Sequence, residues 1–174
     1  MTLRNAGLGL LVLSGMVMLG SCPVNRPEPE PAATPEPIII DNTEAGAAVL
    51  AGDWETAPTT DGNGSYGPDF LYHFADRENV NTVRYTPIIQ TAGTYTVSIW
   101  WSAAENRTAD QPVLVHDANG DTTYHVNLQE HGNQWFELGQ HVFSVGADGY
   151  VEFTSDTADG YCNADAVRFV FVAL

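Results

Sequence analysis

The stretch TYTVSIWWS, residues 94–102, decides the fold of this chain. Its apolar side chains occupy every second position, and Thr96, Ser98, Trp100 and Ser102 fill the positions between them. Successive side chains of a β-strand point to opposite faces, so this pattern predicts a strand with one face in a hydrophobic core. The segment around Arg168 repeats the alternation.

Similar strand signals recur every 8 to 14 residues from residue 38 onward, separated by turn residues. Helical periodicity is nearly absent from this region. The strands that we predict cover residues 38–42, 47–54, 69–74, 82–86, 94–102, 113–117, 122–128, 135–143, 150–155 and 166–172. Many short strands without intervening helices predict an all-β fold, a single antiparallel β-sandwich of the jelly-roll type.

The dipeptide Asn119-Gly120 is the strongest hairpin signal in the chain and favours a type I′ turn. A hairpin folded about it would place His116 opposite Thr123 and Val115 opposite Tyr124. His116 and His125 would then lie diagonally on one face, where two imidazoles could share a metal ion. Since no third ligand is evident, we favour two histidines on the solvent-facing side of the hairpin.

The first 22 residues are typical of a secretory signal. A single charged residue, Arg4, precedes an apolar run that is too short to span a bilayer. The run closes with Leu19-Gly20-Ser21-Cys22, which resembles the lipobox of bacterial lipoproteins, although an ordinary signal peptide is the alternative. We therefore predict a signal peptide at residues 1–21 and a lipid anchor on Cys22.

The segment 22–37 is rich in Pro and Glu and is expected to form an extended tether. Because Pro23, and not Asp, follows the lipidated cysteine, the resemblance implies the outer membrane of a bacterial cell envelope. Residues 38–174 then form one domain. Cys162, the remaining cysteine, is expected to be a small buried side chain.

The composition limits the possible partners. The chain has 22 acidic residues, six arginines and no lysine, for a formal net charge of −16. Phosphate binding needs a basic face, so the charge argues against nucleic acid. It also argues against an electrostatic hold on anionic lipid, which leaves the lipid anchor as the predicted membrane contact.

Sequence motifs for catalysis are absent or out of context. Residues 62–67 match G-x-G-x-x-G, but no strand precedes them and no helix signal follows, so we reject a dinucleotide site. No G-x-S-x-G, H-E-x-x-H or C-x-x-C occurs. We therefore predict a protein that is not an enzyme and has no catalytic residues or cofactor.

Aromatic and polar residues suggest where a ligand would bind. Trp100 is a large ring on the polar face of its strand, which suits stacking on a sugar, unless the ring packs under a loop. Trp135 has the same two interpretations, with burial favoured. Asn106 and Arg107 follow in a loop, where they would bind hydroxyls or carboxylates, or fix the loop itself.

Oxygen ligands also cluster before the last predicted strand. Asp156, Asp159, Asn163 and Asp165 lie there, and Asp41 ends the first strand, which often pairs with the last one in sandwiches. A structural Ca²⁺ is conceivable in this position. Ordinary Asx turns explain the same residues, and we favour them, so no metal ligand is assigned.

The order of the motifs resembles a known family. The motifs that carry it are Ile39-Ile40-Asp41-Asn42-Thr43, Tyr66-Gly67-Pro68-Asp69-Phe70-Leu71, Ala92-Gly93-Thr94-Tyr95-Thr96-Val97, Trp100-Trp101-Ser102-Ala103-Ala104-Glu105-Asn106-Arg107-Thr108, Val126-Asn127-Leu128-Gln129, Gly132-Asn133-Gln134-Trp135 and Ala164-Asp165-Ala166-Val167-Arg168-Phe169. Over residues 38–174 the chain is similar to the golvesin C-terminal-like domain, also described as the xanthan-lyase carbohydrate-binding-like domain. The resemblance implies a β-sandwich accessory module that binds carbohydrate.

Together these observations predict a lipid-anchored envelope protein whose domain binds a polysaccharide or cell-surface glycan without transforming it. The predicted ligand contacts are Trp100, Asn106, Arg107, Gln129 and Trp135. A structural or adhesion module that binds a protein partner is the main alternative. A glycan hydrolase is a third, and it would need two carboxylates at glycosidase spacing in a cleft.

Overall fold

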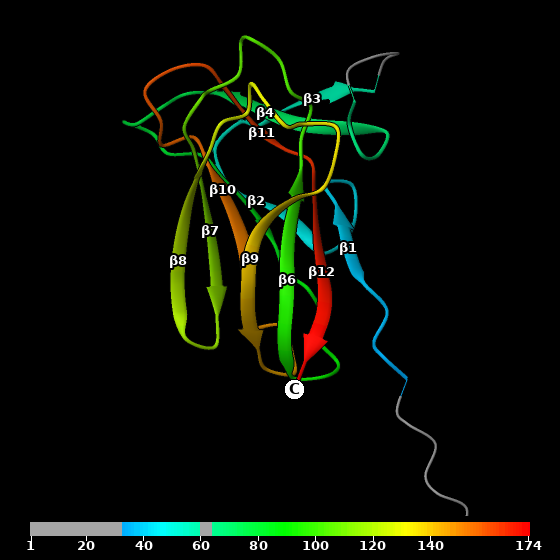
Figure 1. The fold of residues 1–174 in the computed structure, drawn as a ribbon. Coiled ribbons are helices and arrows are strands. Elements are labelled where there is room, and N and C mark those ends of the chain that lie inside the picture. Colours follow the sequence, from blue (N-terminus) through cyan, green and yellow to red (C-terminus); the bar gives the residue numbers. More distant parts are fainter. Residues whose placement is uncertain (1–32, 60–63) are drawn as a thin grey trace, which may run out of the picture. The chain divides into compact units, whose positions relative to one another are not determined.

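A computed structural model describes residues 33–59 and 64–174 of this chain (Figure 1). Both ranges consist of β-strands and their connections and contain no helix, so nothing in them has the length and hydrophobicity of a membrane-crossing helix. The predicted signal peptide, Cys22 and the first part of the tether lie outside the described residues.

The described chain forms twelve strands. In order they are β1 (Ile38–Asp41), β2 (Ala47–Ala51), β3 (Glu55–Pro58), β4 (Asp69–Phe74), β5 (Thr82–Tyr85), β6 (Gly93–Trp100), β7 (Gln111–Asp117), β8 (Gly120–Val126), β9 (Phe136–Phe143), β10 (Tyr150–Thr154), β11 (Tyr161–Ala164) and β12 (Ala166–Ala173). All pairs between these strands are antiparallel.

Two sheets form the body of the domain, with strand orders β1-β12-β6-β9 and β2-β5-β10-β7-β8. The first strand pairs with the last, Ile40 opposite Val167. A third sheet, β11-β4-β3, lies at the upper end of Figure 1. The all-β sandwich predicted from the sequence is confirmed, and the third sheet is an addition that the sequence analysis did not predict.

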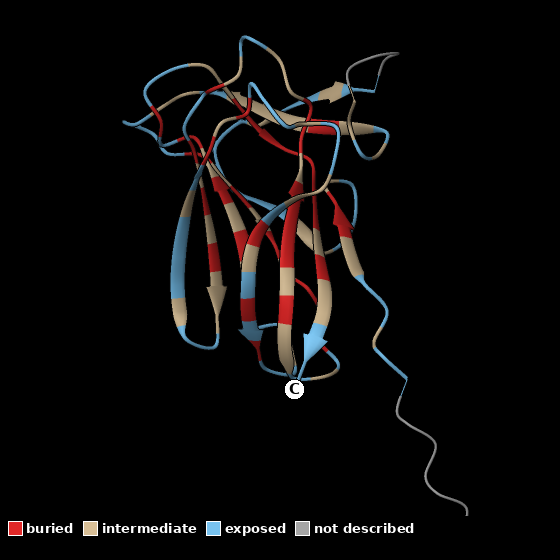
Figure 2. Ribbon diagram, in the orientation of Figure 1, coloured by how far each residue is buried: buried red, intermediate tan, exposed pale blue. Residues whose placement is uncertain are grey.

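The core lies between the two large sheets. On β6 the side chains of Tyr95, Val97 and Ile99 are at most 1% exposed, and Trp101 just beyond the strand is as deeply buried. The alternation is visible as red and tan bands along the strands (Figure 2). Burial of each such side chain contributes about 1.5–3 kcal/mol, so the period-two pattern of residues 94–102 is what holds this sheet on the core.

The predicted register of the β7–β8 hairpin is wrong. Asp117 pairs with Gly120, which puts Ala118 and Asn119 in the turn and shifts the pairing by two residues: Val115 lies opposite Thr122, and His116 opposite Asp121. The Asp117 carboxylate accepts a hydrogen bond from the Asn119 backbone N–H at 2.7 Å, and the positive φ of 115° falls on Gly120. Because neither turn residue has a positive φ, the turn is not type I′.

The corrected register separates the two histidines. His116 and His125 now stand at opposite ends of the hairpin, and each has its own carboxylate. His116 Nδ1 lies 2.5 Å from Asp121 Oδ1, and His125 Nδ1 lies 2.8 Å from Asp110 Oδ1. The diagonal placement in which two imidazoles could share a metal ion is therefore not formed by this hairpin.

Candidate functional site

The outer face of the third sheet carries a group of aromatic rings. Along β4, Leu71 packs against the core, so Phe70, Tyr72 and Phe74 lie on the opposite face. Tyr161 of β11 pairs with Phe74, and its ring centroid is 5.2 Å from that of Phe74 and 5.9 Å from that of Tyr72. The third sheet thus presents an aromatic surface directed away from the core.

The loop that follows β6 borders this surface, because its backbone pairs with β11. The Tyr161 N–H donates to the Asn106 carbonyl, and the Thr108 N–H donates to the Tyr161 carbonyl, both at 3.0 Å. The two segments form a short parallel bridge between Arg107 and Tyr161. Gly160 permits this close approach, since it has φ +78° and a Cβ there would lie 2.5 Å from the Thr108 backbone nitrogen.

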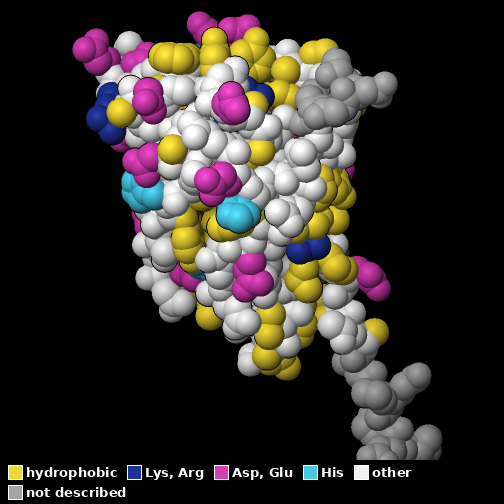
Figure 3. All heavy atoms as spheres, turned by 45° about the horizontal axis from the view of Figure 1, so that its top comes forward, with side chains coloured by type: hydrophobic (Ala, Val, Ile, Leu, Met, Phe, Trp, Pro, Cys, Tyr) yellow, Lys and Arg dark blue, Asp and Glu magenta, His cyan; other side chains and the backbone are white. Residues whose placement is uncertain are grey.

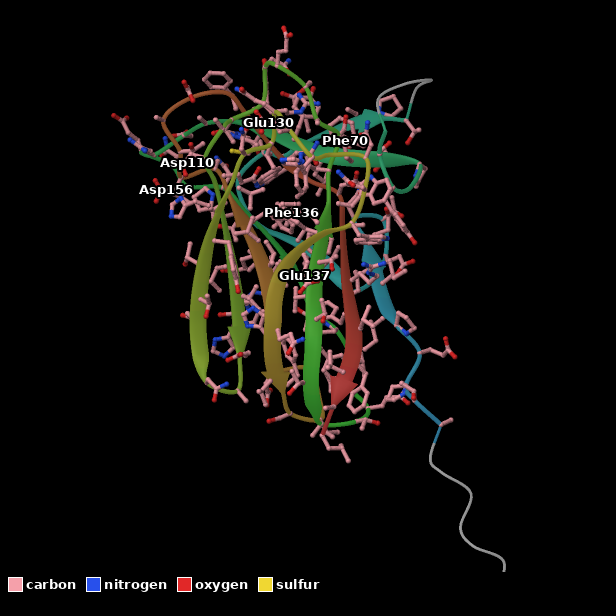
Figure 4. The ribbon with its side chains drawn as sticks, viewed as in Figure 1. Phe70, Asp110, Glu130, Phe136, Glu137 and Asp156 are labelled. Atoms are coloured by element: carbon pink, nitrogen blue, oxygen red, sulfur yellow. The ribbon has the colours of Figure 1, made fainter. Side chains whose placement is uncertain are left out.

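The aromatic surface and the loop line a shallow, open pocket of about 200 Å³. Its lining residues are Ala57, Phe70, Tyr72, Asn106, Arg107 and Tyr161. Figure 4 places the labelled Phe70 at the third sheet, and Figure 3, with this end turned forward, shows hydrophobic side chains gathered there. Phe70 is buried, and the two tyrosines are half-buried. The pocket therefore combines ring faces with amide, phenol and guanidinium groups.

Arg107 is fixed at the rim by neutral groups. Its guanidinium carbon lies 5.4 Å from the Phe70 ring centroid, Nε donates to the Ser102 carbonyl at 3.3 Å, and Nη1 donates to Asn106 Oδ1 at 3.1 Å. Burial lowers the pKa of Arg107, but an arginine stays charged at any physiological pH. The Gln129 side-chain amide donates to the Arg107 carbonyl at 2.9 Å and so holds the backbone of the loop.

Tyr72 forms the other polar part of the pocket. Its hydroxyl donates to Glu55 Oε2 at 2.8 Å, and this hydrogen bond raises the pKa of Tyr72. The six lining residues include no carboxylate and so lack the pair that most glycosidases use. What the pocket offers is binding chemistry: ring faces that can cover C–H groups, and donors that can bind oxygens.

Trp100 and Trp135, two of the predicted contacts, lie in a different place, on the outer face of the β1-β12-β6-β9 sheet. The two rings are 5.5 Å apart, and Tyr66 contacts both, at 5.7 and 5.0 Å. Trp100 Nε1 donates to the Gly64 carbonyl at 2.8 Å, and the Arg168 guanidinium lies 4.6 Å from the Trp135 ring centroid. Both rings pack under the 64–67 loop, and their role as ligand contacts stays a prediction.

The predicted oxygen cluster divides between surface and interior. Asp156 lies at the surface, 3.9 Å from Arg77, and Asp159 is exposed. Asn163 is fully buried on β11, and neither its side-chain oxygen nor its nitrogen has a hydrogen-bond partner in the described chain. Asp165 is also fully buried. The loop therefore does not gather its four residues around one point.

Asp165 belongs instead to an acidic group with Asp41, which is also buried, and Asp69, which is half-buried. The Tyr66 backbone N–H donates to its two oxygens at 3.3 and 3.1 Å, yet burial, helped by the charges of Asp41 and Asp69, raises the pKa of Asp165 to about 8. Asp41 is 5% exposed, and its Oδ2 has no hydrogen-bond partner among the described residues. This carboxylate oxygen and Asp165 are where a cation would be held.

A metal centre in the usual sense is not formed by the described ranges. They contain no group of three or more His, Cys, Asp or Glu side chains arranged to hold a metal ion. A site at Asp41 and Asp165 would need amide or carbonyl oxygens to complete it, and the Asn42 side-chain oxygen is buried there without a partner. Structural calcium therefore stays the untested alternative to the Asx turns that we favour.

Sequence reasoning found two of the six lining residues, Asn106 and Arg107. It did not find Ala57, Phe70, Tyr72 or Tyr161, because β3 and β11 were not predicted and β4 was assigned no partner. The alternation Phe70, Tyr72, Phe74 around Leu71 was the available signal, since three aromatic residues on one face of a strand need either a core or a ligand to cover them.

Comparisons with known proteins show the family of this domain. Residues 38–171 match the model of the Golvesin C-terminal domain. A xanthan lyase from Bacillus sp. (strain GL1) is 35% identical over 156 residues, which cover 87% of this chain and 16% of that protein. This chain thus corresponds to a small part of that relative.

Solved structures of other proteins have a similar fold. The structure of Paenibacillus xanthan lyase has a TM-score of 0.70 and 33% identity, covering 78% of this chain and 13% of that one. A family 35 carbohydrate binding module from Clostridium thermocellum has a TM-score of 0.54 at 12% identity, covering 76% of this chain and 98% of the module, which shows a shared fold. On the family match and the 33–35% identities, the chain belongs to the Golvesin C-terminal domain family.

Proposed function

We propose that this protein binds carbohydrate in the pocket on the third sheet. The observation that carries the proposal is the pocket itself, in which the rings of Tyr72 and Tyr161 adjoin the polar groups of Asn106 and Arg107. An aromatic ring covers the C–H face of a sugar while neighbouring donors and acceptors bind its hydroxyls. The shared fold with a family 35 carbohydrate binding module is consistent with this role.

The role that we propose is binding without catalysis. The relative that is named a xanthan lyase is several times longer than this chain, and the matched region is 16% of it. A pocket lined by rings, an amide and a guanidinium, without a carboxylate pair, suits retention of a glycan better than its cleavage.

We also propose that the protein is held at a bacterial cell envelope, in the outer membrane, by a lipid on Cys22. The support is the sequence Leu19-Gly20-Ser21-Cys22 and the Pro- and Glu-rich tether at residues 22–37. Expression of wild-type protein and Cys22→Ala in a Gram-negative host, followed by membrane fractionation and mass spectrometry of the N-terminal peptide, tests this. An unmodified Cys22 in the mature wild-type protein would contradict it.

The binding proposal is tested by a glycan array with the purified chain and three alanine variants. Tyr161→Ala removes a pocket ring, and Trp100→Ala removes a ring of the other cluster. Tyr150→Ala is the matched control, because Tyr150 is a half-buried tyrosine on β10 of the five-stranded sheet and does not line the pocket. We expect loss of retention for Tyr161→Ala and none for Tyr150→Ala, with melting temperatures showing that each variant is folded.

Two other outcomes of the glycan array would contradict the proposal. If Trp100→Ala weakens retention without changing the melting temperature, the Trp100 cluster is the binding surface, and the pocket is not. A blank array with a folded protein would contradict carbohydrate binding altogether.

A protein partner is the second candidate, favoured by the exposed edge strand β2. This strand lies at the end of the five-stranded sheet, and Val49 and Leu50 are 47% and 51% exposed. An apolar edge with unpaired backbone groups can accept a further strand from another protein. A Val49→Lys variant that loses a partner while retaining the glycan would assign the two functions to separate surfaces.

A further inference from the structure

Arg107 is a cation that no carboxylate of the described chain neutralises. Arg77 lies 3.9 Å from Asp156 and Arg84 lies 2.5 Å from Glu152, whereas Arg107 has no acidic oxygen of the described residues within 4 Å. Arg168, which lies over the Trp135 ring, has no carboxylate partner among the described residues either, but it does not line the pocket. Of the four described arginines, Arg107 is the one that both lines the pocket and lacks a carboxylate partner.

The hydrogen bonds of Arg107 leave most of its donors for a ligand. A guanidinium has five N–H groups in a rigid fork. Two of them bind protein oxygens, one at Ser102 and one at Asn106, and both acceptors are neutral. These two bonds orient the side chain across Phe70, and the remaining donors have no protein acceptor in the described chain. The cation is held in place and is partly desolvated, which strengthens its attraction for an anion.

We propose that the ligand of this pocket is an acidic saccharide, in which a sugar ring with a carboxylate, such as a uronic acid, binds with that carboxylate on Arg107. The inference rests on the proposed carbohydrate binding and adds the class of sugar. A carboxylate fits the guanidinium fork with two parallel hydrogen bonds, which a single hydroxyl does not do.

The size and polarity of the pocket fix the orientation of this sugar. The pocket of about 200 Å³ is shallow and open to solvent, so one sugar ring can lie in it while the rest of a polymer stays outside. Glu55 holds the hydroxyl of Tyr72 and would repel a second anion. The carboxylate of the sugar therefore faces Arg107, and its hydroxyls face Tyr72.

The net charge of −16 does not prevent this binding. Exposed charges farther than about 8 Å from the ligand are largely screened at physiological ionic strength, whereas a direct contact with a half-buried guanidinium is screened much less. The local cation therefore decides which sugar is bound, and the remote acidic residues mainly slow the approach of a polyanion.

The test compares acidic polysaccharides with their neutral counterparts. Xanthan, polygalacturonate and glucuronoxylan, each in native and carboxyl-reduced form, are titrated by calorimetry or affinity electrophoresis into wild-type protein, Arg107→Gln, Arg107→Lys and Arg77→Gln. Arg77→Gln is the matched control, because it removes the same charge from an exposed arginine outside the pocket.

We expect at least one native polymer to bind at least tenfold more tightly than its carboxyl-reduced form, in line with a hydrogen bond to a charged group. Arg107→Gln should abolish that preference, Arg107→Lys should retain part of it, and Arg77→Gln should leave it intact. If Arg77→Gln weakens binding as much as Arg107→Gln, the effect is one of net charge and the inference is wrong.

Failure of the inference is distinguishable from failure of the proposed function. Equal binding of native and reduced polymers, with loss in Tyr161→Ala, would overturn the acidic sugar and leave carbohydrate binding in place. Absence of binding to every polymer by a protein with an unchanged melting curve would overturn both.

Discussion

Replacing Asp165 with asparagine should stabilise this protein at neutral pH, although Asp165 is completely buried. Its carboxyl group accepts hydrogen bonds from the Tyr66 backbone and lies near the charges of Asp41 and Asp69. Burial and these charges raise its pKa to about 8, so the folded protein holds a proton there at pH 7. Asparagine keeps the acceptor oxygen for Tyr66 and has no proton to lose.

The magnitude follows from the linkage between protonation and folding. The unfolded chain releases this proton above the ordinary pKa of 3.8, while the folded chain keeps it up to about pH 8. The contribution of Asp165 to stability is therefore complete below pH 3.8 and declines as the pH rises toward 8, by about 1.4 kcal/mol per pH unit. From pH 5 to pH 7 the loss is about 3 kcal/mol, a large part of the 5–15 kcal/mol typical of a domain.

Urea unfolding at pH 5, 6 and 7 in the presence of EDTA measures this loss. Wild-type protein should lose about 3 kcal/mol more than Asp165→Asn over this interval. Asp159→Asn is the matched control, because Asp159 is exposed, and its pH dependence should follow the wild type. Identical slopes for wild type and Asp165→Asn would refute the reasoning, since they would mean that the buried carboxyl carries its charge at neutral pH.

The same measurement with calcium in place of EDTA tests the metal. Since no metal ligand is assigned, we expect calcium to leave the stability of wild-type protein at pH 7 unchanged. A cation held by Asp41 and Asp165 would stabilise the ionised carboxylate, so a calcium-dependent rise in the stability of wild-type protein that is absent from Asp165→Asn would contradict this expectation and establish a structural ion.

Three further changes have expected outcomes. Gly160→Ala should destabilise the fold by about 1–3 kcal/mol and weaken glycan retention, because the new Cβ would lie 2.5 Å from the Thr108 backbone nitrogen in a residue with φ +78°. Unchanged urea unfolding and unchanged retention would contradict the role of this close approach. Trp101→Ala should cost about 3–5 kcal/mol in urea unfolding, since the ring is 1% exposed, and a cost below 1 kcal/mol would show that it is not a core residue. Cys162, whose pKa burial raises to about 12, should react with a thiol reagent such as Ellman's reagent only when the protein is unfolded; rapid labelling of the native protein would disprove its burial.

The parts of the fold that could be predicted are those where burial imposes a period on the sequence. β6 and β12 are central strands with one face in the core, and their alternation is plain in the sequence. β3 has the sequence ETAP, largely exposed, and β11 has the sequence YCNA, just four residues long. Neither has a pattern of its own, and each is a strand because β4 offers it a backbone partner.

The contrast between residues with a local sequence signal and residues brought together by strand pairing also explains which parts of the candidate site were predicted. Asn106 and Arg107 stand in a loop, where polar residues with a specific geometry suggest function, and the structure places them at the pocket. Gln129 holds the backbone of that loop. The aromatic part depends on two strands that form by pairing alone, so Tyr161 and its neighbours could not be brought together from local sequence.

The position of β12 has a consequence for how this chain folds during synthesis. β12 is synthesised last of the twelve described strands, yet it lies between β1 and β6 in the middle of its sheet, so β1 has no partner until β12 has left the ribosome. The pocket also depends on segments far apart in the sequence, since its lining residues run from Ala57 to Tyr161. Such non-local pairing is intrinsically slow. This domain therefore stays incompletely folded until β12 has emerged, and a chain that lacks β12 would leave β1 separated from β6 and β9.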